Sequence, residues 1–181
     1  MTDMIGGEKM PIVLQSFTTP GNTSIVANSA GGTFPQIPVV VQPSSTAPFI
    51  DGSNAYLWAP NSAANQTVTF VSEFNFPLGL LNVALPVSVN YAFSGSETVV
   101  VSGVLEVVNL LGIVIATIPV FTNIANAGGP TSVEIASGNT LLALQLLGTT
   151  AVLTITATVT SGAVGTGNYL GQVTVNEVIA L

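Results

Sequence analysis

The sequence predicts an all-β fold, an antiparallel sandwich or barrel, on three observations. Short runs rich in β-branched and aromatic residues recur at spacings of about 8–12 residues along the chain. Turn-forming stretches such as NSAGG, FSGS, NAGGP and ASGN separate these runs. No segment predicts a helix: LLALQLL has helical propensity, but it follows an SGN turn and precedes a strand, so we expect a strand there too.

In the first half of the chain, each expected strand is a short apolar run bounded by turn residues. Within one run, Phe70 and Phe74 share a parity with Phe76, so we expect all three rings on the buried face. The expected strands of this half are Ile12–Phe17, Ser24–Ala27, Pro38–Val41, Tyr56–Trp58, Thr67–Phe74 and Asn82–Asn90.

In the second half, residues 103–121, GVLEVVNLLGIVIATIPVF, have the hydropathy of a membrane span. Glu106 and Asn109 lie inside this stretch, and no basic residue flanks it. Gly112 and Pro119 interrupt it, and its β-branched content favours two strands turned at NLLG. The expected strands of this half are Thr98–Val101, Val104–Val108, Ile113–Val120, Ser132–Ile135, Leu141–Leu147, Val152–Val159 and Gln172–Val178.

The stretch AVLTITATVT, residues 151–160, alternates with the period of a strand that has one buried face. Its apolar set is Leu153, Ile155, Ala157 and Val159, and its hydroxyl set is Thr154, Thr156, Thr158 and Thr160. Threonine suits a face that is half-buried between subunits, because its methyl packs and its hydroxyl bonds without an ion to desolvate. The alternative is a solvent-facing threonine ladder on an ordinary monomer.

The composition is unusually poor in ions. Charged residues make up 5% of the chain, against about a quarter in typical soluble domains. Lys9 is the only basic residue, and the chain has no His. Nucleic-acid binding and polybasic membrane anchoring both depend on Lys and Arg, so the composition argues against both. The absence of Cys excludes disulfides, thiolate zinc sites and Cys nucleophiles.

The first 32 residues differ from the rest, because they hold the only Lys and two Gly-Gly pairs. We predict an N-terminal arm or linker over residues 1–32, and a single sandwich domain over residues 33–181. Within the arm, the segment MPIVLQSF could pair with the open edge of a neighbouring subunit. The alternative is that this segment is the first strand of the sheet. The N-terminus lacks the basic and apolar regions of a secretory signal peptide.

Four stretches between residues 50 and about 155 occur in a characteristic order: IDGSNAYLWAP, QTVTFVSEFNFP, VNYAFSGSETVVVSGVLEVV and SVEIASGNTLLALQLL. This order resembles the galactose-binding-like jelly rolls of carbohydrate-binding modules. The resemblance implies a jelly-roll-like β-sandwich. In those modules Arg, His, Asp or Asn usually grips the sugar, and this chain has neither Arg nor His. The composition also resembles the low-charge, Thr/Val/Asn-rich β proteins of bacterial spore surfaces and extracellular fibres.

Three aromatic residues and one loop are candidate ligand sites. Tyr56, Trp58 and Tyr91 could stack on a sugar if their rings were exposed; the alternative is that Trp58 is a core aromatic. Asp51 and Asn54 of DGSN offer oxygen ligands to calcium. With only one carboxylate, the same stretch also fits a turn before the next strand. We expect no cofactor.

Acid–base catalysis near neutral pH would depend on eight carboxylates. They are Asp3, Glu8, Asp51, Glu73, Glu97, Glu106, Glu134 and Glu177. Those after residue 50 are scattered and form no local motif, and the cationic residues that usually position a sugar for glycoside hydrolysis are missing. We therefore expect no enzymatic activity.

These observations favour a structural protein that assembles with copies of itself, and with no nucleic-acid partner. Its strands carry almost none of the charged residues that normally guard a sheet against pairing with other chains. The expected contact residues are Ile12, Val13, Leu14, Thr154, Thr156 and Thr158. We expect an extracellular or spore-surface fibre or layer, in which other surface proteins or glycans are further candidate partners. The alternatives are a carbohydrate-binding module and a virion coat or tail protein.

Overall fold

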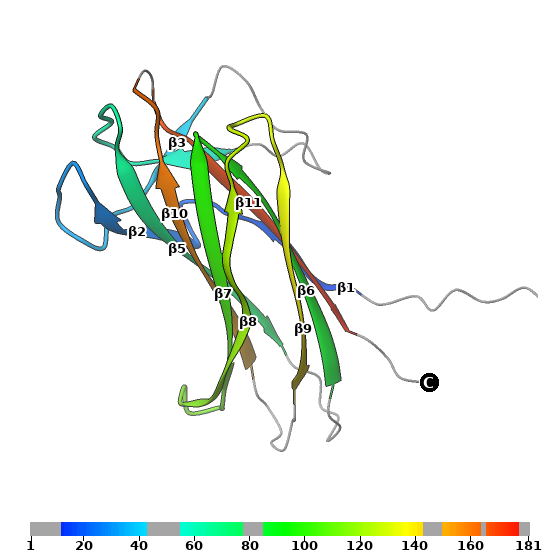
Figure 1. Cartoon of the computed structure of the whole chain (residues 1–181). Helices are drawn as coiled ribbons and strands as arrows, with labels where there is room; N and C mark the ends of the chain where they lie inside the picture. The colour runs from blue at the N-terminus through cyan, green and yellow to red at the C-terminus, as the bar shows by residue number, and fades with distance from the viewer. Residues whose placement is uncertain (1–11, 43–54, 78–84, 143–149, 164–165, 178–181) are drawn as a thin grey trace, which may run out of the picture.

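The computed structural model describes residues 12–42, 55–77, 85–142, 150–163 and 166–177 (Figure 1). Within these ranges the chain forms two antiparallel sheets that face each other, and it contains no helix. The predicted all-β, jelly-roll-like sandwich is therefore confirmed.

The strands follow the apolar runs of the sequence closely. β1 and β4 have the predicted bounds, and the predicted turn at NLLG separates β7 from β8. In chain order the strands are β1 (Ile12–Phe17), β2 (Thr23–Asn28), β3 (Val39–Val41), β4 (Tyr56–Trp58), β5 (Thr67–Pro77), β6 (Leu85–Gly95), β7 (Thr98–Val108), β8 (Val114–Asn126), β9 (Glu134–Leu142), β10 (Thr150–Thr160) and β11 (Tyr169–Glu177).

One sheet has six strands and the other has five. The five-stranded sheet has the order β2-β5-β10-β7-β8. The six-stranded sheet has the order β3-β4-β11-β6-β9, and β1 also pairs with β11. Because β6 occupies one edge of β11 along its whole length, β4 and β1 share the other edge: β4 pairs at Tyr169, and β1 pairs with Gln172–Asn176.

The core lies between the two sheets and is built by strand alternation. The apolar set of β10, from Leu153 to Val159, is fully buried, as its period of two predicted. Phe70, Phe74 and Phe76 of β5 are also buried, in agreement with their shared parity. Facing them from the six-stranded sheet are alternate residues of β6 and β11, which are Val87, Val89, Tyr91, Phe93, Tyr169, Val173 and Val175.

The two long sides of the sandwich differ. On one side, the edge strands β8 and β9 contact each other and close the gap between the sheets. Gly138 of β9 lies directly on β8, since a Cβ atom at Gly138 would be 2.2 Å from the carbonyl oxygen of Val120. On the other side lie β1, β3 and β2, which have no such cover from a second edge strand among the described residues.

Two predicted strand breaks are wrong. Thr98–Val101 and Val104–Val108 form one strand, β7, that continues through Gly103. The ASGN stretch is not a turn, because Ser137, Gly138 and Asn139 pair with β6 in the middle of β9. Residues 143–147 of the expected strand Leu141–Leu147 and residues 82–84 of the expected strand Asn82–Asn90 lie outside the described residues.

The predicted domain boundary at residue 32 does not separate an arm from the sandwich. β1 pairs with β11 of the same chain and β2 pairs with β5, so both segments belong to the two sheets. Phe17 and Ile25 are buried there. The alternative interpretation is the correct one: within MPIVLQSF, Ile12–Phe17 form β1, the first described strand of the six-stranded sheet. No helix among the described residues is long and apolar enough to cross a membrane.

Candidate self-association surfaces

The outer face of the five-stranded sheet is rich in threonine and valine, and Glu73 and Glu106 are the carboxylates that the register places on it. Its central strand, β10, turns its threonines away from the core. The register places Thr158 between Thr69 of β5 and Val100 of β7. We call the following residues the Thr/Val face: Thr67, Thr69, Val71, Val100, Ser102, Val104, Thr154, Thr156, Thr158 and Thr160.

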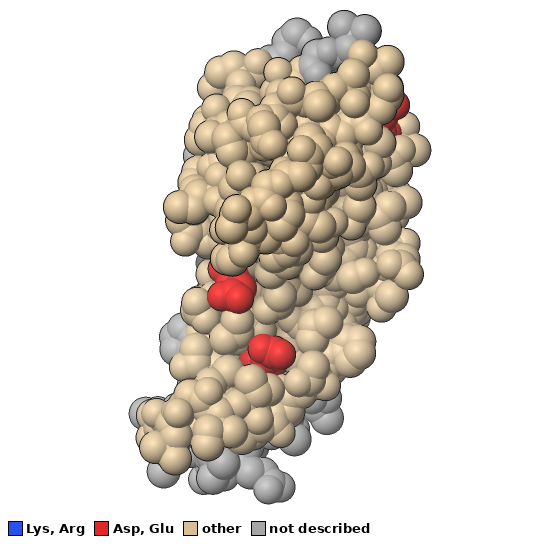
Figure 2. All heavy atoms as spheres, turned by 90° about the vertical axis from the view of Figure 1, so that its left-hand side faces the viewer, with Lys and Arg blue, Asp and Glu red and all other residues tan. Residues whose placement is uncertain are grey.

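Hydroxyl groups of neighbouring strands approach one another on this face. The Oγ1 atoms of Thr69 and Thr158 are 3.4 Å apart, as are those of Thr67 and Thr160. Figure 2 views the molecule from the side on which the five-stranded sheet lies, and shows a surface interrupted by only a few isolated carboxylates. Such a face can be covered by another molecule with little cost of desolvating ions.

β10 itself is not an open edge. It pairs from Thr150 to Thr160 with β5 on one side and with β7 on the other. Although β10 carries no charged residue, it needs no protection at an edge, because its backbone groups already have partners on both sides. Thr154, Thr156 and Thr158 are accessible to a second molecule only through their side chains.

Among the described strands β1 is an open edge, and it carries the other three predicted contact residues. Only β11 pairs with β1 among the described strands, so the opposite edge of β1 is left without a strand partner. Ile12 is 58% exposed and Val13 is also exposed, whereas Leu14 packs partly against the core. The sequence of β1, IVLQSF, contains no charged residue and no proline. It therefore lacks the usual protection against pairing with another chain.

The neighbouring edge β2 is protected in a way that β1 is not. Ile25 and Gln36 exchange two backbone hydrogen bonds, of 2.7 and 2.9 Å, so the chain after β2 folds back over its outer edge. A bulge between Ile25 and Ala27 interrupts the edge further. β3, which pairs only with β4, exposes Val39 and Val40.

The three candidate sugar-stacking rings are buried. Tyr56, Trp58 and Tyr91 are all fully inaccessible to solvent, so they do not form the exposed platform that the sequence suggested. Trp58 lies in the core between the sheets, and its indole Nε1 donates a hydrogen bond of 3.1 Å to Gln66 Oε1. The interpretation of Trp58 as a core aromatic is confirmed.

The sequence analysis did not select Gln66, yet its side chain links β4 to β2 through hydrogen bonds. Besides accepting from Trp58, its Oε1 accepts from the backbone N–H of Ala63, and its Nε2 donates to Asn28 Oδ1 at 2.7 Å. It is almost fully buried. Each of these bonds satisfies a polar group away from water, which marks a structural role.

An open groove of about 370 Å³ lies beside β2. Its polar lining comes from Asn22, Thr23, Ser24, Glu73 and Asn75, and Ile37 is among its apolar residues. The Asn22 side chain is already engaged, because its Oδ1 accepts from the Thr19 N–H and its Nδ2 donates to the Phe17 carbonyl. No aromatic ring lines this groove, so it lacks the stacking surface of a typical sugar site.

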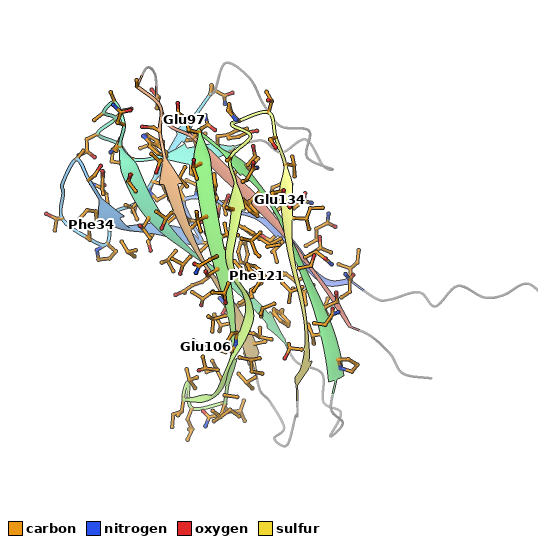
Figure 3. The ribbon with its side chains drawn as sticks, in the orientation of Figure 1. Phe34, Glu97, Glu106, Phe121 and Glu134 are labelled. Atoms are coloured by element: carbon orange, nitrogen blue, oxygen red, sulfur yellow. The ribbon has the colours of Figure 1, made fainter. Side chains whose placement is uncertain are left out.

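The described carboxylates are dispersed over the molecule. Glu97, Glu106 and Glu134 lie at well-separated places in Figure 3. Glu73 lies opposite Thr154, and Glu106 lies opposite Val152 on the other side of β10. Among the described residues there is no group of three or more metal-ligating side chains. The calcium candidates Asp51 and Asn54, and the acids Asp3 and Glu8, lie outside the described residues.

The turn between β7 and β8 exposes a cluster of large aliphatic side chains that the sequence analysis did not select as a site. We call Leu110, Leu111, Ile113, Val114 and Ile115 the β7–β8 tip. Leu110 and Leu111 are 79% and 82% exposed, the highest values among the exposed large apolar residues. The signal for this cluster in the sequence is the uncharged, largely aliphatic run NLLGIVI.

No protein-family model and no curated protein matches the chain. Similar solved structures include the enzymatically active domain of tailspike protein 4 from bacteriophage CBA120, at 12% identity and a TM-score of 0.46. That match covers 88% of this chain and 20% of the tailspike chain. A structure of infectious bursal disease virus, Gx strain, matches at 13% identity and a TM-score of 0.44, over 97% of this chain and 53% of the viral chain.

A third similar structure is the CBM22-1 xylan-binding domain of Xyn10C from Paenibacillus barcinonensis. It matches at 12% identity and a TM-score of 0.41, over 97% of this chain and 100% of that domain. The chain thus spans about a fifth of the tailspike chain and about half of the viral chain. None of these similarities assigns an activity, a ligand or a partner to this chain.

Proposed function

We propose that the chain is a non-enzymatic structural protein that assembles with copies of itself into an extracellular or spore-surface fibre or layer. The observation that carries the proposal is the edge of β1. It is uncharged, has no strand partner among the described residues, and exposes Ile12 and Val13. A second copy that adds a strand to this edge would satisfy its backbone groups and cover both side chains.

Two different contacts are needed for a polymer. If β1 of one copy pairs antiparallel with β1 of another, the contact is the same on both sides and closes as a dimer. The Thr/Val face supplies a second, separate surface on the five-stranded sheet. Contact through the part of this face around Thr156 and Thr158, away from Glu73 and Glu106, would join dimers into a fibre or a layer without burying an ion.

The proposal is tested by placing charge on the β1 edge. In the double variant Ile12→Lys/Gln15→Lys, two exposed positions of β1 receive the residue that natural edge strands use against pairing. The matched control is Ala64→Lys/Ala163→Lys, which adds the same charge at exposed loop positions. Sedimentation velocity over a range of concentrations, with electron microscopy, measures assembly.

We expect the native chain and the loop variant to form large assemblies, and the β1 variant to lose the dimer contact. A native chain that stays a monomer at high concentration would contradict the proposal. So would a β1 variant that assembles like the native chain. Deleting residues 1–32 is not a suitable test, because it removes β1 and β2 and uncovers the core.

A carbohydrate-binding function gains no support from the buried rings of Tyr56, Trp58 and Tyr91. A virion coat or tail protein would use the same assembly chemistry, and electron micrographs of the assemblies would distinguish a closed shell from a fibre.

A further inference from the structure

The β7–β8 tip projects from one end of the sandwich as a convex, apolar loop. The turn links two long strands of the five-stranded sheet, and side chains fan outward from it in Figure 3. All five side chains of the tip are exposed, and those of Leu110 and Leu111 are largely surrounded by solvent. Isolated exposed apolar residues are ordinary, but five within six positions form a patch that indicates an interaction.

The turn satisfies most of its own backbone donors: of the N–H groups from Asn109 to Ile113, those of Asn109, Leu111, Gly112 and Ile113 have partners within the turn. The N–H groups of Leu111 and Ile113 donate to Asn109 Oδ1, at 2.9 and 3.0 Å. The Asn109 N–H donates to the Ile113 carbonyl at 3.0 Å, and the Gly112 N–H donates to the Asn109 carbonyl at 2.9 Å. Gly112 has a φ of 76°, a left-handed backbone conformation that glycine adopts without the steric cost of a side chain, and this conformation allows the tight turn. A loop that satisfies most of its own donors can enter the interface of a bilayer at lower cost than one whose donors all depend on water.

The tip is also free of charge. The nearest carboxylate in the sequence is Glu106, which pairs with Thr117 further along the sheet, and residues 107–133 contain no ionisable side chain. Since Lys9 is the only basic residue of the chain, nothing at the tip attracts an anionic headgroup. Any attraction to lipid must therefore come from apolar burial.

The size and shape of the tip favour lipid over a protein partner. A stable protein interface takes about 20–30 residues on each side, and the tip offers five. A convex loop also needs a matching concave surface on a protein, whereas lipid chains adapt to any shape. We propose that the β7–β8 tip inserts into the interface of a bilayer of net-neutral lipid, independently of the assembly proposed above.

The test is flotation of the protein with phosphatidylcholine vesicles, using the double variant Leu110→Ser/Leu111→Ser. This change keeps Asn109 and Gly112, so the turn is retained. The matched control, Val26→Ser/Ile135→Ser, removes two exposed aliphatic residues elsewhere on the surface. We expect the native chain and the control to float with the vesicles, and the tip variant to bind at least about tenfold more weakly. Adding phosphatidylserine should not strengthen binding.

A fluorescence measurement gives a second readout. Trp58 is the only tryptophan and is fully buried, so it contributes a constant background. In a Leu111→Trp variant, we expect the emission to shift to shorter wavelength when neutral vesicles are added. The inference is overturned if the native chain does not float, if the tip variant floats equally well, or if binding requires anionic lipid. It is also overturned if the tip variant loses self-association while vesicle binding is unchanged, because the tip then contacts a second copy.

Discussion

At the scale of single residues, the centre of the core holds a pair of buried tyrosines. Tyr91 of β6 and Tyr169 of β11 are fully buried, and their hydroxyl groups share a hydrogen bond. Burial raises the pKa of Tyr91 well above its ordinary value, with a further increase from the neighbouring Tyr169. Burial also raises the pKa of Tyr169, although its hydrogen bond to Tyr91 acts in the opposite direction. Both side chains therefore stay protonated in the folded protein.

This pair predicts a loss of stability at high pH. In the unfolded chain both phenols ionise near pH 10, whereas in the folded chain they do not. The unfolded state then binds fewer protons at high pH, so the contribution of this pair to the free energy of unfolding should be constant below about pH 9. It should fall by up to about 2.7 kcal/mol per pH unit above pH 10. Urea unfolding between pH 7 and pH 11 measures this slope.

The double variant Tyr91→Phe/Tyr169→Phe serves as the control. It removes both ionisable groups together, so neither hydroxyl loses its partner, and its stability should depend much less on alkaline pH. An equally steep alkaline loss in this variant would show that other groups cause it.

Glycines account for both wrong strand breaks. At Gly103, a Cβ atom would be 2.6 Å from the Phe121 ring, and at Gly138 it would be 2.2 Å from the Val120 carbonyl oxygen. These glycines allow close approach inside a strand, which a single sequence cannot distinguish from a turn. Figure 3 shows Phe121 on β8, far along the chain from Gly103. Whether each glycine marks a turn or a close contact inside a strand thus depends on a residue of another strand, which is Phe121 for Gly103 and Val120 for Gly138.

At the scale of strands, alternation predicted which residues of an element face the core but not which elements are neighbours. The pattern of β10 gave its buried face correctly, because that depends only on the pleat. Its central position depends on pairing with β5 and β7, which come from other parts of the chain. For the same reason, the open edge at β1 and the bridge that protects β2 could be recognised only in the folded structure.

This arrangement gives a prediction for the Thr/Val face. The variant Thr154→Lys/Thr156→Lys/Thr158→Lys places three charges on the face of a central strand, and β1 is unchanged. If the face joins dimers made through β1, this variant should stop at the dimer, because covering the face would now require desolvating three further ions at its centre. Sedimentation equilibrium measures the mass.

A triple variant with Ser at the same three positions is the control, since it keeps neutral hydroxyls and should still polymerise. Full polymerisation of the lysine variant would remove the Thr/Val face from the assembly. A monomeric lysine variant would mean that the face, and not β1, makes the first contact.

At the scale of the whole molecule, the scarcity of ions should determine how assembly responds to salt. The chain has a net charge of −7, so copies repel one another weakly, and no described contact surface depends on an ion pair between opposite charges. Added salt screens this repulsion without weakening apolar contacts or backbone pairing. The concentration at which assemblies appear should therefore stay constant or fall as sodium chloride is raised from about 0.02 M to about 0.5 M. Light scattering of a dilution series at each salt concentration measures this threshold. Assemblies that dissolve at high salt would require pairing between opposite charges, which this sequence can supply only through Lys9 and the N-terminal amino group.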